Sequence, residues 1–254
     1  MTDSANPLTK SQELAKANEG CKPSLKKPGT GDGRAEPLYI DEKGLSKEHF
    51  MLPPHYVDSI DRLLVPYGFV VDRIERLAWD IKTTYGNEDL HLICVLKGSR
   101  GFFNHLLNAL NRIHMYQNRH TTSLPFYEHY VRLKSYKGMQ STGELTVIAE
   151  DLSVLEGKHV LVVEDIIDTG TTLTKFAKYL EDIKPRSVGV ASLTEKRTTR
   201  SSGFKGDFVG FSIPDEFVVG FGLDYNEIFR DLDHICVISK SGIEKFAKVR
   251  QGAH

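Results

Sequence analysis

The sequence predicts an α/β protein whose mainly parallel sheet is flanked by helices. Three apolar runs, at 90–96, 159–163 and 187–193, have the length of strands. Continuous apolar runs of this kind are typical of parallel strands that are covered on both faces. Segments with apolar residues at helical spacing lie between these runs, and strand-helix alternation favours a parallel sheet. The 254 residues, 40% of them hydrophobic, are enough to bury a core.

The other elements follow from periodicity and from turn residues. In the segment 172–183, for example, Leu173, Phe176 and Leu180 share one helical face. Helices are expected over 59–64, 72–85, 101–112 and 172–183. Further strands are expected at 127–136, 146–149, 208–210, 218–222 and 235–239. Ligands of such sheets bind beyond the carboxyl ends of the strands, so residues there are the first candidates for a site.

The N-terminal segment differs in composition from the rest of the chain. Residues 1–36 are rich in Lys, Gly, Pro, Ser and Asn and have few large apolar side chains. We expect them to form a disordered or weakly ordered extension, and residues 37–254 to form one domain. The glycine-rich segment 29–34 follows no predicted strand and does not fit GxGxxG, so it is interpreted as linker.

The amino-acid composition limits the cellular location and the kinds of partner that are expected for this protein. Cys21, Cys94 and Cys236 are few and far apart, which argues against a disulfide framework or a zinc site. Cys94 and Cys236 lie in apolar runs and are expected to be buried and reduced. The sequence shows no secretory signal and no apolar run of membrane length, so a cytoplasmic protein is expected. A net charge of -1 gives no support to a nucleic-acid partner.

The most informative segment is HVLVVEDIIDTGTTL, at residues 159–173. A buried strand ends in Glu164 and Asp165, and it is followed by Asp168 and a turn that opens a helix. Gly170 permits tight turning, and free N–H groups and the dipole at a helix start favour an anion. The hydroxyl groups of this turn add further donors. They belong to Thr169, Thr171 and Thr172.

Such a turn can hold a phosphate monoester. Glu164 and Asp165 would repel that phosphate unless they face ribose hydroxyls or a cation. The alternative is an ordinary strand-loop-helix whose acidic residues cap the helix and face water, since acids are common at helix starts. The complete string after an apolar strand favours the phosphate site over this alternative.

The string resembles the signature of the type I phosphoribosyltransferases. Other segments of the chain are similar to the hypoxanthine-guanine phosphoribosyltransferases of that family. They are LKSY at 133–136, QSTG at 140–143, VASL at 190–193, KRTTR at 196–200 and DFVGFSIPDEFVVGFGLDYNEIFRD at 207–231. The likeness covers about residues 52–246. It implies the type I phosphoribosyltransferase fold, with a small hood subdomain beside the main sheet.

The resemblance implies a reaction and a cofactor. Hypoxanthine or guanine and 5-phosphoribosyl-1-pyrophosphate would give IMP or GMP plus pyrophosphate, with Mg²⁺ as the cofactor. Asp168 would be the catalytic residue, as general base or proton acceptor at purine N7. The sugar 5-phosphate would lie on the turn formed by Thr169, Gly170, Thr171 and Thr172. The ribose hydroxyls would contact Glu164 and Asp165. The implied metal ligands are Glu164, Asp165 and Asp224.

The resemblance also implies contacts to the base and to the leaving group. Lys196 would donate to the purine 6-oxo group, Phe217 would stack on the ring, and Val218 would contact the base edge through its backbone. The implied pyrophosphate contacts are Lys97, Gly98, Arg200 and Arg230. Ser135 and Tyr136 fall in a flap that would close over the site. In the family, the peptide bond before Lys97 can be cis.

Some residues depart from the family pattern, and other functions compete. Many relatives carry glycine, an aromatic residue and lysine where this chain has Ser99, Arg100 and Gly101. The main alternative is a non-catalytic paralogue that binds nucleotide or phosphoribosyl pyrophosphate. Such proteins can lose the residues that contact the base, and the presence of these residues here argues against it. An adenine or orotate transferase, or a ribose-phosphate diphosphokinase, is disfavoured by KRTTR at 196–200 and PDEFVVGFGLDYNE at 214–227. The family implies a homodimer or homotetramer, and the ranking of hypoxanthine, guanine and xanthine stays open.

Overall fold

A sheet of seven strands forms the centre of the protein. The computed structural model describes residues 36–117, 123–135 and 145–247. In spatial order the strands are β1 (Leu38–Tyr39), β8 (Phe208–Pro214), β7 (Ser187–Arg197), β6 (His159–Ile167), β3 (Leu90–Leu96), β4 (Phe126–Ser135) and β5 (Leu145–Ala149). All neighbours run parallel except β4 and β5. The predicted mainly parallel sheet is therefore confirmed.

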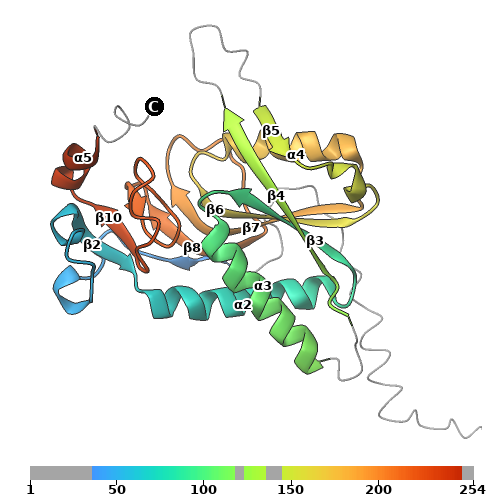
Figure 1. The fold of residues 1–254 in the computed structure, drawn as a ribbon, viewed down its shortest axis with the longest axis horizontal. Coiled ribbons are helices and arrows are strands. Elements are labelled where there is room, and N and C mark those ends of the chain that lie inside the picture. Colours follow the sequence, from blue (N-terminus) through green and yellow to red (C-terminus); the bar gives the residue numbers. More distant parts are fainter. Residues whose placement is uncertain (1–35, 118–122, 136–144, 248–254) are drawn as a thin grey trace, which may run out of the picture.

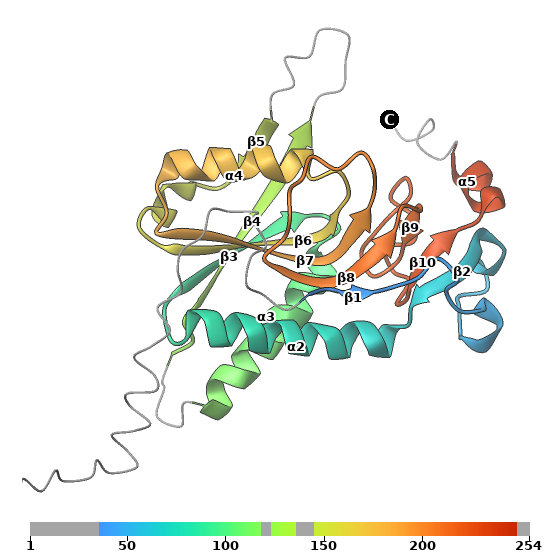
Figure 2. The same ribbon diagram turned by 180° about the vertical axis from the view of Figure 1, so that it is seen from behind.

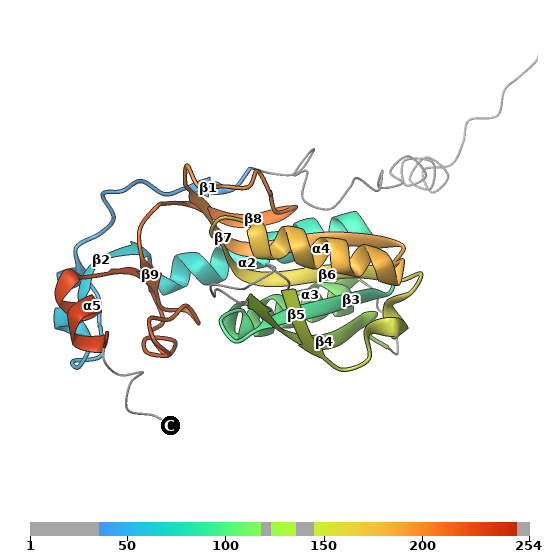
Figure 3. The ribbon, with the colours of Figure 1, turned by 90° about the horizontal axis from the view of Figure 1, so that it is seen from above.

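Helices cover both faces of this sheet (Figures 1 and 3). Helices α2 (Tyr67–Tyr85) and α3 (Arg100–Gln117) lie on one face, and α4 (Thr171–Ile183) and the 3-10 helix η3 (Leu152–Leu155) lie on the other. Successive side chains of a strand point to opposite faces. In β3, Leu92 and Cys94 therefore join the core under α2 and α3, while Ile93 joins the core under α4. This two-sided burial explains the continuous apolar run.

A smaller antiparallel sheet lies at one end of the large sheet (Figure 2). Its strands are β2 (Ile60–Val65), β10 (Ile235–Ile238) and β9 (Val218–Val219). Short helices accompany it, namely η1 (Lys47–His49), η2 (Val57–Ser59) and α5 (Lys240–Phe246). Leu63, Phe229 and Cys236 are fully buried in its own core. We call this part the hood, since it corresponds to the small subdomain that the family resemblance implies.

The predicted helix at 59–64 is wrong, because this segment forms strand β2. In a segment of six residues, the apolar positions fit the spacing of a helix and that of a strand, so periodicity cannot distinguish the two. The partner decides, since β10 pairs with β2 antiparallel and places Cys236 opposite Leu63. The predicted strand at 218–222 is also too long. It ends at Val219 because Gly220 and Gly222 take positive φ angles, 96° and 98°.

Several predicted elements extend further than expected. Strand β6 was expected to end at Val163 but continues to Ile167, and β7 continues to Arg197. The two extensions pair with each other, with Ile166 opposite Thr194. Helix α2 begins at Tyr67 rather than at residue 72, directly after Pro66. Glu164 and Asp165 thus lie inside β6 and not at its end.

The remaining predictions divide by location. Cys94 and Cys236 are buried and free, as expected, whereas Cys21 lies outside the described residues. Residues 1–35 also lie outside them, so the predicted extension stays a prediction. Within 36–117, 123–135 and 145–247, no helix has both the length and the apolar character needed to span a bilayer.

Candidate active site

A pocket opens beyond the carboxyl ends of β3 and β6. The chain proceeds from β3 to β4 on one side, while β7 and β8 lie on the other side of β6. Ligands of open parallel sheets bind where the strand order changes direction in this way. The pocket has a volume of about 260 Å³. Its lining consists of Val95, Leu133, Glu164, Asp165, Ile166, Ile167, Asp168, Thr169, Gly170, Thr172 and Leu173.

The turn between β6 and α4 requires a glycine at position 170. Gly170 is the N-cap of α4 with φ at 79°, in the left-handed region. A Cβ there would lie 2.6 Å from Cβ of Phe204 and 2.9 Å from Oγ of Ser202. The Thr169 hydroxyl donates to Oγ1 of Thr171 at 3.1 Å. Because the first N–H groups of a helix lack intrahelical partners, this turn presents donors and a positive dipole end to the pocket.

A buried serine contacts both of the adjacent acidic residues of β6. The Ser99 hydroxyl donates to Oε1 of Glu164 at 3.2 Å and accepts from the backbone N–H of Asp165 at 3.1 Å. Burial and the neighbouring carboxylate of Asp165 raise the pKa of Glu164 well above its ordinary value. Burial also raises the pKa of Asp165. Two carboxylates that ionise with difficulty in a pocket suit a bound cation or sugar hydroxyls.

The loop after β3 packs directly against these acids. The Leu96–Lys97 peptide bond is cis. A Cβ at Gly98 would lie 1.6 Å from Oδ2 of Asp165, so this close approach requires glycine. The hood reaches the same loop, since a Cβ at Gly222 would lie 2.1 Å from the carbonyl oxygen of Gly98. Two glycines therefore bring the acid pair, the loop and the hood into contact.

Lys97 and Arg230 share one carboxylate at the edge of the hood. Lys97 Nζ lies 3.0 Å and Arg230 Nη2 3.3 Å from the carboxylate of Glu227. Hydrogen bonds from these two cations lower the pKa of Glu227. Arg230 Nη2 also lies 2.8 Å from Oδ1 of Asp224. Two cations at one exposed edge can bind the oxygens of a polyphosphate.

Asp168 lies between two cations from the β7 region. Its carboxylate is 3.5 Å from Lys196 Nζ and 3.5 Å from Arg200 Nη2. The Lys196 side chain is only 10% exposed, while that of Asp168 is 44% exposed. Arg200 also pairs with Asp215 at 3.1 Å. The structure therefore brings Arg200 to Asp168, and it brings Arg230 rather than Arg200 into an ion-pair network with Lys97.

The hood supplies an aromatic side chain that is partly exposed. Phe217 is 46% exposed and meets Tyr225 edge to face, with ring centroids 5.3 Å apart. Val218 is buried in β9. Ser135 ends β4, but its side chain is outside the described residues, as are Tyr136 and the segment 140–143. The predicted flap therefore stays a prediction.

Sequence reasoning missed three contributors to this site. Ser99 was noted only as a departure from the family pattern, although its hydroxyl joins the loop to the acid pair. Glu227 and Gly222 were not singled out. The glycine next to a predicted strand end was an available signal for close backbone approach. Nothing in the spacing of Glu227 indicated that it would pair with Lys97, which is 130 residues away.

The fold and the pocket define a class of protein: an α/β domain with a pocket at the switch point of a parallel sheet, where a helix start suits a phosphorylated ligand. Residues 68–226 match the phosphoribosyl transferase domain, and the chain belongs to this family. It is 54% identical over 220 residues to the hypoxanthine-guanine-xanthine phosphoribosyltransferase of Plasmodium falciparum, an alignment that covers 86% of this chain and 95% of that one.

Two further relatives agree with this placement. The human hypoxanthine-guanine phosphoribosyltransferase is 48% identical over 207 residues, which cover 81% of this chain and 94% of the human protein. The crystal structure of the Schistosoma mansoni hypoxanthine-guanine phosphoribosyltransferase in complex with IMP is similar, with a TM-score of 0.69 and 37% identity. That similarity covers 83% of this chain and 99% of the Schistosoma chain.

Proposed function

We propose that this protein is a purine-salvage enzyme that transfers a 5-phosphoribosyl group from 5-phosphoribosyl-1-pyrophosphate to hypoxanthine or guanine. The observation that carries the proposal is the pairing of Lys196 with Asp168 beside the phosphate turn. The 6-oxo group and N7 lie on the same edge of a purine. A base that accepts a hydrogen bond from Lys196 therefore presents N7 to Asp168. The names of the Plasmodium and human relatives support this assignment.

The chemistry follows from the arrangement of the groups. The bond between the anomeric carbon and pyrophosphate breaks, purine N9 bonds to that carbon, and the N7 proton passes to Asp168. The phosphate turn at Gly170 holds the 5-phosphate, and Glu164 and Asp165 accept from the ribose hydroxyls. Lys97 and Arg230 would bind the departing pyrophosphate. Positive charge that develops on the sugar ring is favoured by the nearby carboxylates.

Mg²⁺ fits the donor set as a cofactor that is shared with the substrate. Across the parts of the chain that the structure describes, no three His, Cys, Asp or Glu side chains gather closely enough to hold a metal by themselves. Mg²⁺ usually takes one or two carboxylates together with substrate oxygens and water. Asp224 on the hood and the pair Glu164 and Asp165 are such carboxylates. When bound, Mg²⁺ would neutralise charge on the pyrophosphate.

A panel of bases tests the proposal. Purified protein is supplied with 5-phosphoribosyl-1-pyrophosphate, Mg²⁺ and hypoxanthine, guanine, xanthine, adenine or orotate in turn, and product is followed by absorbance. Turnover with hypoxanthine or guanine, and none with adenine or orotate, is expected. Calorimetric binding of the pyrophosphate substrate without turnover of any base would contradict the proposal and favour the non-catalytic alternative.

We further propose that the protein is cytoplasmic and acts as a homodimer or homotetramer. Large apolar side chains are exposed on α2 and α3, among them Phe69, Trp79 and Met115. Exposed apolar groups of this size are commonly covered by a second subunit. Light scattering after size-exclusion chromatography should give two or four times the 28.6 kDa chain mass. A mass of one chain at assay concentration would contradict this proposal.

A further inference from the structure

The described chain begins with a segment that joins the large sheet to the hood. We call residues 36–45 the N-terminal strap. Its first part, β1, is the edge strand of the large sheet and pairs parallel with β8, with Leu38 opposite Phe211. Its end pairs with β2 of the hood, where Leu45 and Leu63 exchange hydrogen bonds of 2.8 and 3.0 Å. Figure 3 shows this blue segment running from β1 toward the hood.

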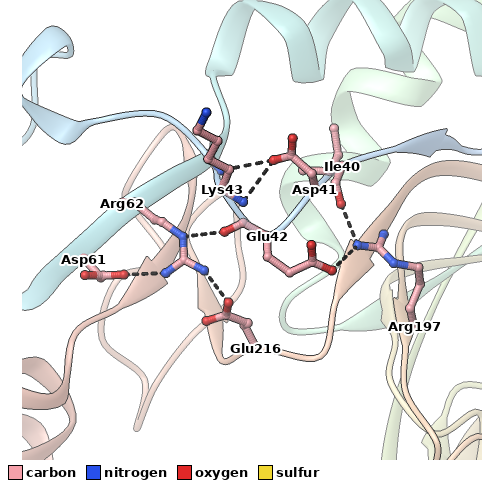
Figure 4. Close-up of polar contacts among 9 residues, drawn as sticks. Ile40, Asp41, Glu42, Lys43, Asp61, Arg62, Arg197 and Glu216 are labelled. Atoms are coloured by element: carbon pink, nitrogen blue, oxygen red, sulfur yellow. Dashed lines mark hydrogen bonds and ion pairs between the residues drawn. The ribbon is translucent and has the colours of Figure 1, made fainter.

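Arg197 fixes the strap to the large sheet (Figure 4). Its Nη1 donates to the carbonyl oxygen of Ser212 at 2.6 Å, and its Nη2 donates to that of Ile40 at 2.7 Å. The guanidinium carbon also lies 4.0 Å from the ring centroid of Tyr39. A forked guanidinium that serves two carbonyls and an aromatic face is held in one orientation. Arg197 directly follows Lys196, which the proposed function assigns to the purine.

Arg62 fixes the strap to the hood. Its Nε donates to the carbonyl oxygen of Glu42 at 2.9 Å. Its two remaining nitrogens pair with the carboxylates of Asp61 and Glu216. Figure 4 shows this guanidinium between all three acceptors. Glu216 directly precedes Phe217, which the proposed function also assigns to the purine.

The turn of the strap holds the two accepting carbonyls in a fixed relation. Oδ1 of Asp41 accepts from the backbone N–H groups of Lys43 at 3.0 Å and Gly44 at 3.3 Å. Gly44 has φ at 57°, and a Cβ there would lie 2.5 Å from the carbonyl oxygen of Leu63. The carbonyls that serve Arg197 and Arg62 therefore lie two residues apart on a locked turn.

We propose that the N-terminal strap sets the distance between the two residues that grip the purine, Lys196 on the large sheet and Phe217 on the hood. The proposal rests on the proposed function, which gives these two residues their ligand. Arg197 and Arg62 are positioning residues, because they bind the strap and Glu216 and lie next to, or contact the neighbour of, a residue assigned to the purine. The phosphate turn belongs to β6 and α4, which make none of these contacts. Loosening the strap should therefore weaken binding of the purine and leave binding of the phosphoribosyl donor intact.

The test uses the full chain with R62Q and R197Q as variants and K43Q as the matched control. Lys43 is an exposed side chain on the same strap. Both arginine variants should raise the KM for guanine about tenfold, because small misplacements of binding groups have effects of this order. The KM for 5-phosphoribosyl-1-pyrophosphate should change less than about twofold, and K43Q should match wild type. R62K, which keeps the charge toward Glu216 but loses the fork, should fall between R62Q and wild type.

An equal rise of both KM values, or no change in either, would overturn the proposal. Thermal unfolding checks that each variant is folded. If a variant does not fold, E216Q replaces it. E216Q weakens the contact between Arg62 and Glu216 and leaves the hydrogen bonds to the strap carbonyls in place. Inactive wild-type protein would count against the proposed function instead. Calorimetry with GMP and with 5-phosphoribosyl-1-pyrophosphate then tests the same split in affinity, and wild-type protein that fails to bind GMP would overturn the strap proposal as well.

Discussion

Asp168 combines exposure to the pocket with two nearby cations. Both Lys196 and Arg200 lie 3.5 Å from its carboxylate, and Asp168 lines the pocket. We predict that D168A lowers kcat about 10²–10⁴-fold, the usual contribution of a general base. Affinity for 5-phosphoribosyl-1-pyrophosphate should stay within about threefold, because the phosphate turn is unchanged. Steady-state kinetics and calorimetry check the two parts, with the exposed D182A on α4 as control. Near-normal turnover of D168A would contradict its assignment.

Glu164 is predicted to lower the stability of the folded protein at neutral pH, although the proposed reaction needs it. An acid whose folded pKa is raised holds its proton more tightly when folded, so stability falls as pH rises from its unfolded pKa of about 4.3 toward the folded value. Burial and Asp165 raise the pKa of Glu164. We predict that E164Q removes this cost at neutral pH and raises Tm by about 2–4 °C, as a gain of about 1 kcal/mol would.

Thermal unfolding of E164Q against wild type, in EDTA from pH 4 to 8, measures this effect. The difference in Tm should grow with pH and then level off, while turnover with Mg²⁺ falls. E164Q that is less stable than wild type at pH 7 would contradict this prediction. E150Q, which changes an exposed acid on the β5 side, is the matched control.

Helix α4 depends on the glycine at its N-cap, Gly170. Gly170 and Gly203 both have positive φ, 79° and 84°, but only at Gly170 would a Cβ meet other atoms. We predict that G203A costs about 1 kcal/mol for the left-handed backbone, and that G170A costs about 1–3 kcal/mol more and weakens phosphate binding. Urea unfolding and calorimetry with 5-phosphoribosyl-1-pyrophosphate measure both quantities. Equal loss in the two variants would show that the contact with Phe204 relaxes freely.

The site as a whole lies between two separately packed parts. The large sheet provides Asp168 and Lys196, and the hood provides Phe217, Asp224 and Arg230. Phe229 is fully buried in the hood core, with ring centroids 4.7 Å from Tyr56 and 5.1 Å from Phe246. Loss of hood packing should therefore displace Phe217, Asp224 and Arg230 without touching the phosphate turn.

We predict that F229A lowers the free energy of unfolding by about 3–5 kcal/mol, the usual cost of truncating a buried phenylalanine. Urea unfolding measures it, and the exposed V154A on η3 should change stability by less than about 0.5 kcal/mol. Activity of the folded F229A fraction should fall as well, because Arg230 is the next residue. A loss in F229A as small as that in V154A would show that the hood core contributes little to the fold.

The local sequence pattern was sufficient to predict an element whose structure depends only on its own residues. The strand at 90–96 was predicted with the bounds that the structure gives β3, because a two-sided apolar run allows few alternatives. The phosphate turn was readable for a similar reason, since strand, acids, glycine and helix follow one another within 15 residues. The family resemblance then supplied residues such as Phe217 and Asp224, whose local sequence is typical of any core strand or loop.

The sequence by itself determined the parallel sheet, the acid pair and the turn at Gly170, because each depends on neighbours along the chain. Only the tertiary structure decided that 60–65 is a strand, since β10 supplies its hydrogen bonds. Tertiary contacts also placed Ser99 between Glu164 and Asp165, and joined Arg62 to Glu216 across 154 residues. Such contacts arise when segments that are far apart along the chain pack together, and their distances in sequence leave no periodic pattern to read.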